Sequence, residues 1–573
     1  MQPLAAARRA RVAGRPQDAV APLRDAYARR PNDPKVLEEI GLTSVDLGDL
    51  GNALGALVRA LDLDPELGDA RRTLCWMLES NQLTEESPQV VRVVQALLDR
   101  DDVAPQPLVR SALNLALRRP AVQQAVASRD ADPSVDAWEL LPEAMLTDGL
   151  LRRVLERDLN RDPDLERLLV RLRRDFLLRA PDLTPARLSF AASLAQQAHN
   201  NEFVFVETAE EQAAVRRLVP DDARNLLRLA MYRPLTELAD AEDLLRRDWP
   251  KPVAALIEGV LRPHLEELDL KRELQSFSPI EDGVSALVSD HYEHNPYPRW
   301  FSLTVPQREH RLRALEGLLG QRLATGGGKL QVLVAGGGTG KQSILAAIAY
   351  GDSAEVLAID LSRTSLAYSM RKAREYNVRN LKHLHGDLLE VGRLPQAFDI
   401  VECTGVLVCV RDPQAALAAL VAKLKPGGLI YLALYSEAAR ADVVAARQMI
   451  AELGIGDSPD EMRRFRHTMI TGPDSPLRTE LLGSPGFYSL STCRDFLFHR
   501  VEHRFSLAQV DGLLRSCGLR FFCWDLPAGV LPRFRNRFGA AADPRDLALW
   551  EVYERENPRT FRGMYNFWCR QEG

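Results

Sequence analysis

From about residue 326 onward, short aliphatic runs alternate with stretches of helical periodicity. The runs stand at 331–335, 356–360, 381–385, 398–404 and 429–435. Helix-like stretches at 341–350 and 365–377 separate the first three runs. This alternation predicts a parallel sheet with right-handed crossover helices. Because such sheets bind ligands at the carboxyl ends of their strands, a binding site is expected where glycines follow the first strand.

The segment VLVAGGGTGKQS at 332–343 places those glycines. A triphosphate-binding loop has the pattern G-x4-G-K-[ST], but Gln342 stands where the hydroxyl is required and Ala335 where the first glycine belongs. A dinucleotide-binding loop has the pattern G-x-G-x-x-G, and Lys341 stands where its third glycine belongs. Neither type of phosphate-binding loop therefore fits this segment.

The observed spacing is G-x-G-x-G, formed by Gly336, Gly338 and Gly340. A purely structural turn would also use glycine, because glycine adopts positive φ readily. The loop resembles motif I of the class I S-adenosylmethionine-dependent methyltransferases, in which the backbone approaches the amino-acid moiety of the cofactor. The resemblance implies that the three glycines and Thr339 bind S-adenosylmethionine.

Two aspartates follow the second and third expected strands. Asp360 ends the second strand, and an acid there can accept hydrogen bonds from both ribose hydroxyls. The alternative role for Asp360 is that of a helix N-cap. The resemblance implies that Asp387 accepts from the adenine amino group, whereas the alternative is a turn aspartate. It also extends the cofactor site to neighbouring residues, namely Leu361, Leu388 and Gly405.

The resemblance covers residues 326–435 closely and the chain up to residue 573 more loosely. It implies a Rossmann-like α/β domain with a seven-stranded sheet of order 3-2-1-4-5-7-6, whose last two strands would be 519–526 and 560–571. Pro-Gly-Gly in the segment 423–434 is expected directly before the fifth strand. The sequence departs from the family at Val334, where motif I usually carries an acid. One cofactor contact is then missing or is supplied by another residue.

The segment DHYEHNPYPRW at 290–300 is dense in aromatic and polar side chains. It resembles a segment that precedes the methyltransferase core in bacterial proteins with fused helical repeats. We interpret it as a lid over the cofactor, and the alternative is a rigid linker. Tyr292, Glu293 and Tyr435 are the candidates for orienting a methyl acceptor. Tyr435 would end the fifth strand, where core packing is its alternative role.

Residues 436–505 are expected to form an insert that caps the substrate pocket. Cys493, His499 and His503 lie within it and are residue types that bind metals. A strand through this stretch would separate them, and no fourth ligand stands at a useful spacing. We therefore predict no metal site.

The first 70 residues contain a 34-residue period. Four positions recur at that spacing, with Ala19, Leu23, Ala26 and Pro31 repeated as Ala53, Leu57, Ala60 and Pro65. Small residues let paired helices approach closely, and proline ends the second helix of each pair. The pattern resembles tetratricopeptide repeats. The alternative is an Ala/Leu-rich bundle with a chance period.

These observations predict four regions. An all-α part would comprise helical repeats at 1–100 and a helical domain at 101–275. A linker or lid would follow at 276–325, and the methyltransferase domain would occupy 326–573. Helical solenoids expose long concave surfaces, so the repeats favour a protein or peptide partner, although they also mediate self-association.

The net charge and the cysteine content indicate which partners and which compartment to expect. The net charge of −5, from 74 basic and 79 acidic residues, favours neither nucleic acid nor an anionic membrane as a partner. The seven cysteines are scattered without any CxxC motif, which favours reduced thiols in a cytoplasm. The sequence begins without a secretory signal and has no apolar run of about 18 residues, so no membrane span is expected.

The sequence thus predicts a cytoplasmic class I methyltransferase that uses S-adenosylmethionine and acts on a protein or peptide recruited by its helical arm. Two alternatives stay open at this point. One is a small-molecule methyltransferase whose arm only assembles a complex, and the other is an inactive interaction scaffold. Cofactor binding separates the scaffold from the two enzymes.

Overall fold

The computed structural model describes residues 2–80, 87–100, 103–305, 309–320, 323, 328–527 and 529–571. The chain forms two compact units. The first, which we call the helical unit, comprises residues 1–258 and 301–304. The second, the sheet unit, comprises residues 259–300 and 305–573. Helix α16 (Lys251–Glu273) contains the chain boundary between the two units.

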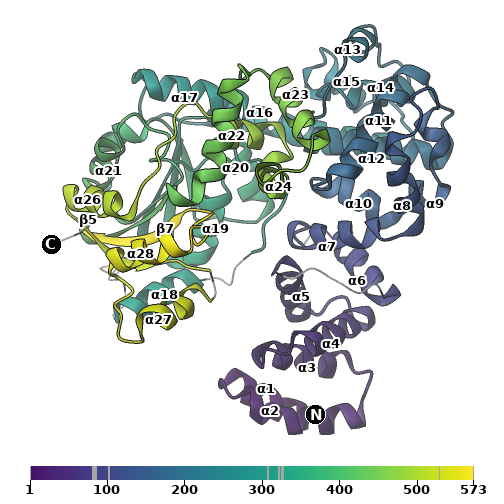
Figure 1. The fold of residues 1–573 in the computed structure, drawn as a ribbon. Helices are drawn as coiled ribbons and strands as arrows, with labels where there is room; N and C mark the ends of the chain where they lie inside the picture. Colours follow the sequence, from purple (N-terminus) through teal and green to yellow (C-terminus); the bar gives the residue numbers. More distant parts are fainter. Residues whose placement is uncertain are drawn as a thin grey trace. The chain divides into compact units, whose positions relative to one another are not determined.

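The helical unit begins with the helices α1 (Gln2–Val12), α2 (Pro16–Arg29), α3 (Pro34–Asp46), α4 (Leu50–Leu63), α5 (Gly68–Ser80) and α6 (Pro88–Leu98). The first four pack as sequential pairs, α1 with α2 and α3 with α4 (Figure 1). A Cβ atom at Gly41 of α3 would lie 2.6 Å from the Leu57 side chain of α4, so these two helices approach closely. Asp33 and Asp49 cap the N-termini of α3 and α4 with their carboxylates. The assignment of these pairs as tetratricopeptide repeats stays a prediction.

The rest of the helical unit packs around a core with buried aromatic side chains. Its helices are α7 (Gln106–Leu117), α8 (Pro120–Ala127), α9 (Glu143–Leu146), α10 (Gly149–Arg157), α11 (Pro163–Arg179), α12 (Pro185–Asn200), α13 (Ala209–Val215), α14 (Ala223–Ala230) and α15 (Ala241–Leu244). Trp138 is fully buried between Phe176 and Phe190, and its indole nitrogen donates to the Leu172 carbonyl at 2.8 Å. No strand occurs among the described residues of this unit.

The sheet unit contains a seven-stranded sheet with the order β3-β2-β1-β4-β5-β7-β6. The strands are β1 (Leu330–Ala335), β2 (Ala354–Asp360), β3 (Leu381–His385), β4 (Phe398–Thr404), β5 (Leu424–Leu434), β6 (Leu519–Trp524) and β7 (Tyr565–Gln571). Strands β1 to β5 pair in parallel, and β7 runs antiparallel to both β5 and β6. The predicted fold class is therefore confirmed, including the antiparallel pair at one edge.

Helices cover the sheet (Figure 1). Those before β1 are α17 (Gly283–His294) and α18 (His310–Leu319), and those along the sheet are α19 (Lys341–Tyr350), α20 (Arg363–Glu375), α21 (Pro413–Val421), α26 (Leu507–Ser516), α27 (Val530–Phe538) and α28 (Leu547–Glu556). One buried core joins β1, β4 and β5 to α21, α26 and α28. Apolar faces on both elements account for this packing, since sheets bury their aliphatic runs against helices.

The Pro-Gly-Gly turn lies inside β5 instead of directly before it, which corrects the expected strand boundary. Strand β5 already pairs with β4 at Leu424, and the register then shifts before pairing resumes at Leu429. Gly427 has φ +72, a conformation that favours glycine. The turn signal therefore marks an irregularity within the strand.

Four helices lie between β5 and α26, in the stretch expected to form an insert. They are α22 (Ala441–Glu452), α23 (Pro459–Thr471), α24 (Pro476–Gly483) and α25 (Leu490–Leu497). Cys493 lies in α25, whereas His499 and His503 follow the end of that helix. Within the described ranges, no group of three or more potential metal ligands comes together.

All seven cysteines are free thiols. In the part of the chain that the structure describes, no helix combines the length and the apolar character needed to cross a membrane.

Candidate functional site

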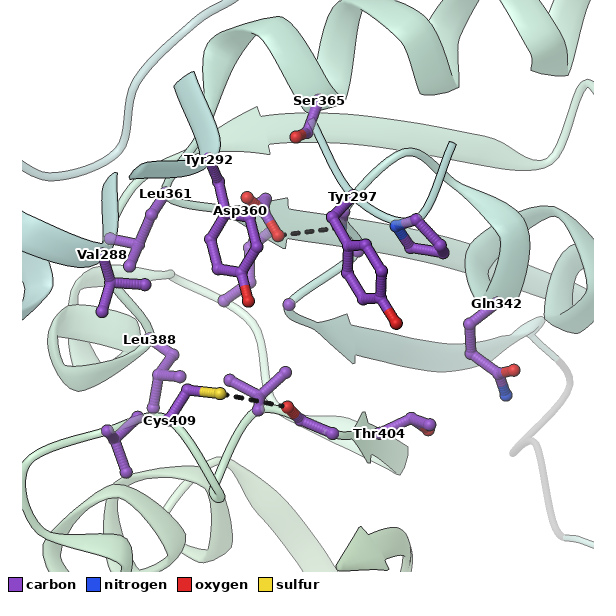
Figure 2. A pocket seen from close by; sticks show the side chains of 18 of the residues that line it. Val288, Tyr292, Tyr297, Gln342, Asp360, Leu361, Ser365, Leu388, Thr404 and Cys409 are labelled. Atoms are coloured by element: carbon purple, nitrogen blue, oxygen red, sulfur yellow. Dashed lines mark hydrogen bonds between the residues drawn. The ribbon is translucent and has the colours of Figure 1, made fainter. Parts of the chain in front are cut away.

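A cavity of about 320 Å³ opens at the carboxyl ends of the central parallel strands (Figure 2). Its walls come from the loop after β1, the ends of β2, β3 and β4, helix α17 and the insert. The volume lies at the lower end of the range of small-molecule sites in proteins. The predicted site residues that line it are Gly336, Gly338, Asp360, Leu361, Asp387, Leu388, Gly405, Tyr292 and Tyr435.

The glycine loop is shaped by close contacts. Gly336 has φ +76, and a Cβ atom there would overlap the Val406 side chain. Gly338 has φ +50, and its Cβ would lie 2.9 Å from the Tyr297 carbonyl oxygen. Both positions line the cavity, so only a residue without a side chain brings the backbone to its surface. Gly340 does not line the cavity, and its lack of a Cβ makes room for Ser369 of α20.

Asp360 holds the loop and also faces the cavity. One carboxylate oxygen accepts from the Gly338 amide at 2.8 Å, and the other accepts from the Ser362 amide at 2.9 Å. Burial raises the pKa of Asp360, while these backbone amides act in the opposite direction. The N-cap of α20 is Ser362, so Asp360 does not fill the helix-capping role considered as its alternative.

Asp387 caps a short 3-10 helix and also lines the cavity. It is only 2% exposed, and its carboxylate accepts from the Leu389 amide at 2.9 Å as the cap of a short 3-10 helix. Asp387 and Leu388 nevertheless line the cavity. The two carboxylates of Asp360 and Asp387 therefore reach one cavity from neighbouring strands of the sheet.

Two buried hydroxyl groups on the cavity wall indicate what kind of ligand the cavity suits. The side-chain oxygens of Thr404 and Ser365 are buried and have no hydrogen-bond partner among the described residues. Buried hydroxyls are normally paired, because an unpaired one costs about 1–3 kcal/mol. With the two carboxylates nearby, the donor and acceptor set suits a ligand rich in hydroxyl and amino groups.

The carboxylate absent at Val334 occurs on the adjacent strand. Val334 of β1 pairs in register with Glu402 of β4, which is fully buried. Glu402 accepts hydrogen bonds from Arg311 at 2.8 Å, from Gln342 at 2.8 Å and from Tyr350 at 2.6 Å. Gln342 lines the cavity, so Glu402 acts on the site through the orientation of this amide.

The segment 290–300 packs on the glycine loop. The Thr339 hydroxyl donates to the Pro298 carbonyl, and the Trp300 indole donates to the Thr339 carbonyl at 3.1 Å. Thr339 is fully buried and does not line the cavity, and its role in cofactor binding stays a prediction. Tyr297 and Pro298 line the cavity instead, so this segment forms part of its wall.

Three tyrosines and an aspartate meet at the cavity. The Tyr292 hydroxyl donates to Asp495 at 2.9 Å, and Tyr297 lines the cavity with them. Tyr435 lines the same cavity directly after β5. Sequence reasoning missed Tyr297 and Asp495, since Asp495 lies in α25 without any motif around it. Its only signal was its place in the insert expected to cap the pocket.

Glu293 lies elsewhere, which corrects its assignment as a residue that orients the acceptor. Its carboxylate pairs with Lys271 at 2.5 Å and accepts from the Thr364 amide at 3.1 Å. It does not line the cavity. Consecutive residues of a helix point about 100° apart, and here Tyr292 faces the cavity while Glu293 points toward Lys271.

Residues 332–428 match the family model described as methyltransferase domain. An uncharacterized protein from Synechococcus sp. is 33% identical over 183 residues, which cover 31% of this chain and 43% of the relative. The mitochondrial ubiquinone biosynthesis O-methyltransferase of Schizosaccharomyces pombe is 35% identical over 85 residues, 14% of this chain and 31% of the relative. The chain thus spans less than half the length of these curated relatives.

Among solved structures, PKMT2 from Rickettsia typhi in complex with AdoHcy is 16% identical. The similarity covers 46% of this chain and 53% of that chain, with a TM-score of 0.36.

The strand order, the glycine loop and the family match together make residues 332–428 of the sheet unit similar to a methyltransferase domain.

Proposed function

We propose that this protein binds S-adenosylmethionine in the cavity of the sheet unit and methylates a protein or peptide acceptor. The observation that carries the proposal is the convergence of the glycine loop with the carboxylates of Asp360 and Asp387 on one cavity. The side-chain hydroxyls of Thr404 and Ser365 support it, because both are buried on the wall of this cavity without a hydrogen-bond partner among the described residues.

The residues of the cavity have distinct parts in this proposal. Gly336 and Gly338 present backbone at the cavity surface, and Asp360 and Asp387 accept hydrogen bonds from hydroxyl and amino groups. S-adenosylmethionine, when bound, supplies a methyl group on a sulfonium that leaves readily. The chain itself aligns the acceptor and excludes water, for which the wall formed by segment 290–300 is suited.

The acceptor class rests on the helical unit. The sequential pairs α1–α2 and α3–α4 and the tight Gly41–Leu57 contact support a repeat architecture. Arrays of helical repeats present extended surfaces that suit polypeptide partners. A protein or peptide acceptor accounts for the presence of such an array in a methyltransferase.

Calorimetric titration of S-adenosylmethionine tests cofactor binding, with NADH as the control ligand. We expect saturable binding by the full-length protein. Asp360→Ala should weaken it by about 10- to 100-fold, because hydrogen bonds to a charged group contribute about 1.5–3 kcal/mol. Glu355→Ala, an exposed residue of the same strand, is the matched control and should bind normally. Absence of binding by the folded wild type would favour a scaffold.

Transfer of labelled methyl groups tests the acceptor class. The full-length protein is incubated with labelled S-adenosylmethionine and a cell extract, which is then separated into macromolecules and small molecules. We expect the label in protein. Label only in the small-molecule fraction would overturn the proposed acceptor class while preserving methyltransferase activity.

A further inference from the structure

The cavity contains a cluster of side chains that cofactor binding does not explain. Tyr292 belongs to α17, Tyr297 follows that helix, Tyr435 follows β5, and Asp495 belongs to α25 of the insert. All four line the cavity. The rings of Tyr292 and Tyr297 are stacked with centroids 6.4 Å apart, and Figure 2 shows both among the lining side chains.

Asp495 is a buried carboxylate in the wall of the cavity. It is 8% exposed, and within the described ranges it forms no ion pair. Its carboxylate accepts a hydrogen bond from a neutral group, the hydroxyl of Tyr292, at 2.9 Å. Burial raises the pKa of Asp495, because its charge is poorly solvated. A buried carboxylate in this state is stabilised by any ligand that brings a positive charge.

The basic groups near the cluster form no ion pair with Asp495 among the described residues. Arg440 lies 3.9 Å over the ring of Tyr435, but its guanidinium pairs with Glu502. His291 packs against Tyr292, and burial lowers the pKa of His291 to about 4, so it is neutral at pH 7. Glu502 also pairs with Arg447 and Arg504, and both Arg440 and His499 act electrostatically on Asp495. Among the described residues neither of these two forms an ion pair with Asp495, so its carboxylate can still accept an N–H from a cationic ligand in the cavity.

The geometry points to an amine as the methyl acceptor, held by Asp495 and enclosed by Tyr292, Tyr297 and Tyr435. This inference rests on the proposed function and names the chemical class of its acceptor. Aromatic rings attract organic cations through their negative faces, and a carboxylate accepts the N–H of an ammonium group. A carboxylate or thiolate acceptor would instead be repelled by Asp495. In a polypeptide, a lysine ε-amino group is an acceptor of this class.

Asp495 also has a part in preparing an amine. An ammonium nitrogen has no free electron pair, so it must lose a proton before it can attack carbon. Transfer of that proton from nitrogen to an oxygen of Asp495 leaves the electron pair on nitrogen and makes Asp495 a neutral carboxylic acid. A buried carboxylate is suited to this step, since its environment favours the neutral form.

Binding of a small amine tests the inference without any methyl transfer. The probe is n-butylammonium, compared by calorimetry with n-butanol and butyrate on the full-length protein. We expect n-butylammonium to bind at least ten-fold more tightly than either control ligand. Asp495→Asn should remove this preference, and Tyr435→Phe should keep it because the ring remains. Asp525→Asn is the matched control, since Asp525 also accepts a tyrosine hydroxyl but lies outside the cavity.

The outcomes separate this inference from the proposed function. Equal binding of n-butanol, preference for butyrate, no binding of n-butylammonium, or an unaffected Asp495→Asn variant would each overturn the amine site. The labelled product gives a second measurement, because methylated amines survive alkaline treatment and methyl esters do not. Alkali-labile label would refute the amine acceptor. Failure of the wild type to bind S-adenosylmethionine would refute the proposed function itself.

Discussion

At the scale of single residues, the site depends on positions where an added side-chain atom or a lost carboxylate would change the cavity. Gly336 and Gly338 bring backbone to the cavity surface, and Asp360 ties that backbone to β2. Motif I has no acid at Val334, but Glu402 of the adjacent strand β4 places a carboxylate beside this position in the register of the sheet. The position of a carboxylate in the fold matters more here than its position in a motif.

Gly336→Ala should disrupt the loop. The new Cβ would overlap Val406, and alanine would have to adopt φ +76. We expect a loss of stability of about 1–3 kcal/mol and at least ten-fold weaker binding of S-adenosylmethionine. Thermal unfolding and calorimetry measure the two effects. Gly512→Ala in α26 has open space around the added methyl group and should be neutral or stabilising. Equal behaviour of the two variants would contradict the assigned role of Gly336.

At the scale of elements, the cavity is completed by segments outside the sheet. The parallel strands supply the glycine loop and the two aspartates, whereas α17, segment 290–300 and α25 supply the tyrosines and Asp495. Segment 290–300 is anchored by Trp300, which is 4% exposed and packs against Tyr368. The buried indole of Trp300 is therefore one of the anchors of this wall, beside the hydrogen bond from Thr339 to Pro298.

Trp300→Ala should loosen segment 290–300. Removal of a buried tryptophan costs about 3–5 kcal/mol, and here it also removes the hydrogen bond to the Thr339 carbonyl. We expect faster hydrogen exchange in 290–300 and weaker binding of S-adenosylmethionine. Trp76→Ala is the control, because Trp76 is 49% exposed in the helical unit. Unchanged exchange in 290–300 would show that the segment is held independently of Trp300.

At the scale of the whole molecule, the chain divides into a helical unit and a sheet unit, and all residues that line the cavity belong to the sheet unit. Each unit has its own buried core. A ligand of the cavity should therefore stabilise the sheet unit directly.

Differential scanning calorimetry with S-adenosylmethionine tests this division. A ligand at 100 times its dissociation constant stabilises the unit that binds it by about 2.7 kcal/mol. We expect one unfolding transition to move to higher temperature and a second to stay in place, with NADH moving neither. An equal shift of all transitions would show that the two units unfold as one.

The sequence by itself determined the elements and the centre of the site. Aliphatic runs and glycines have local meaning, so the strands and the position of the glycine loop were predictable. The strand order followed from the resemblance to a known family. The expected edges were wrong where Pro-Gly-Gly lies within β5. The four-part division and the roles of Asp360 and Asp387 in cofactor binding stay predictions.

Only the tertiary structure decided which side chains face the cavity. Tyr292 and Glu293 are neighbours in sequence, yet one lines the cavity and the other pairs with Lys271. Asp495 comes from the insert, 203 residues from its hydrogen-bond partner Tyr292. Glu402 supplies a carboxylate beside Val334 through strand pairing. Such contacts join residues distant in the chain, and local sequence patterns carry no record of them.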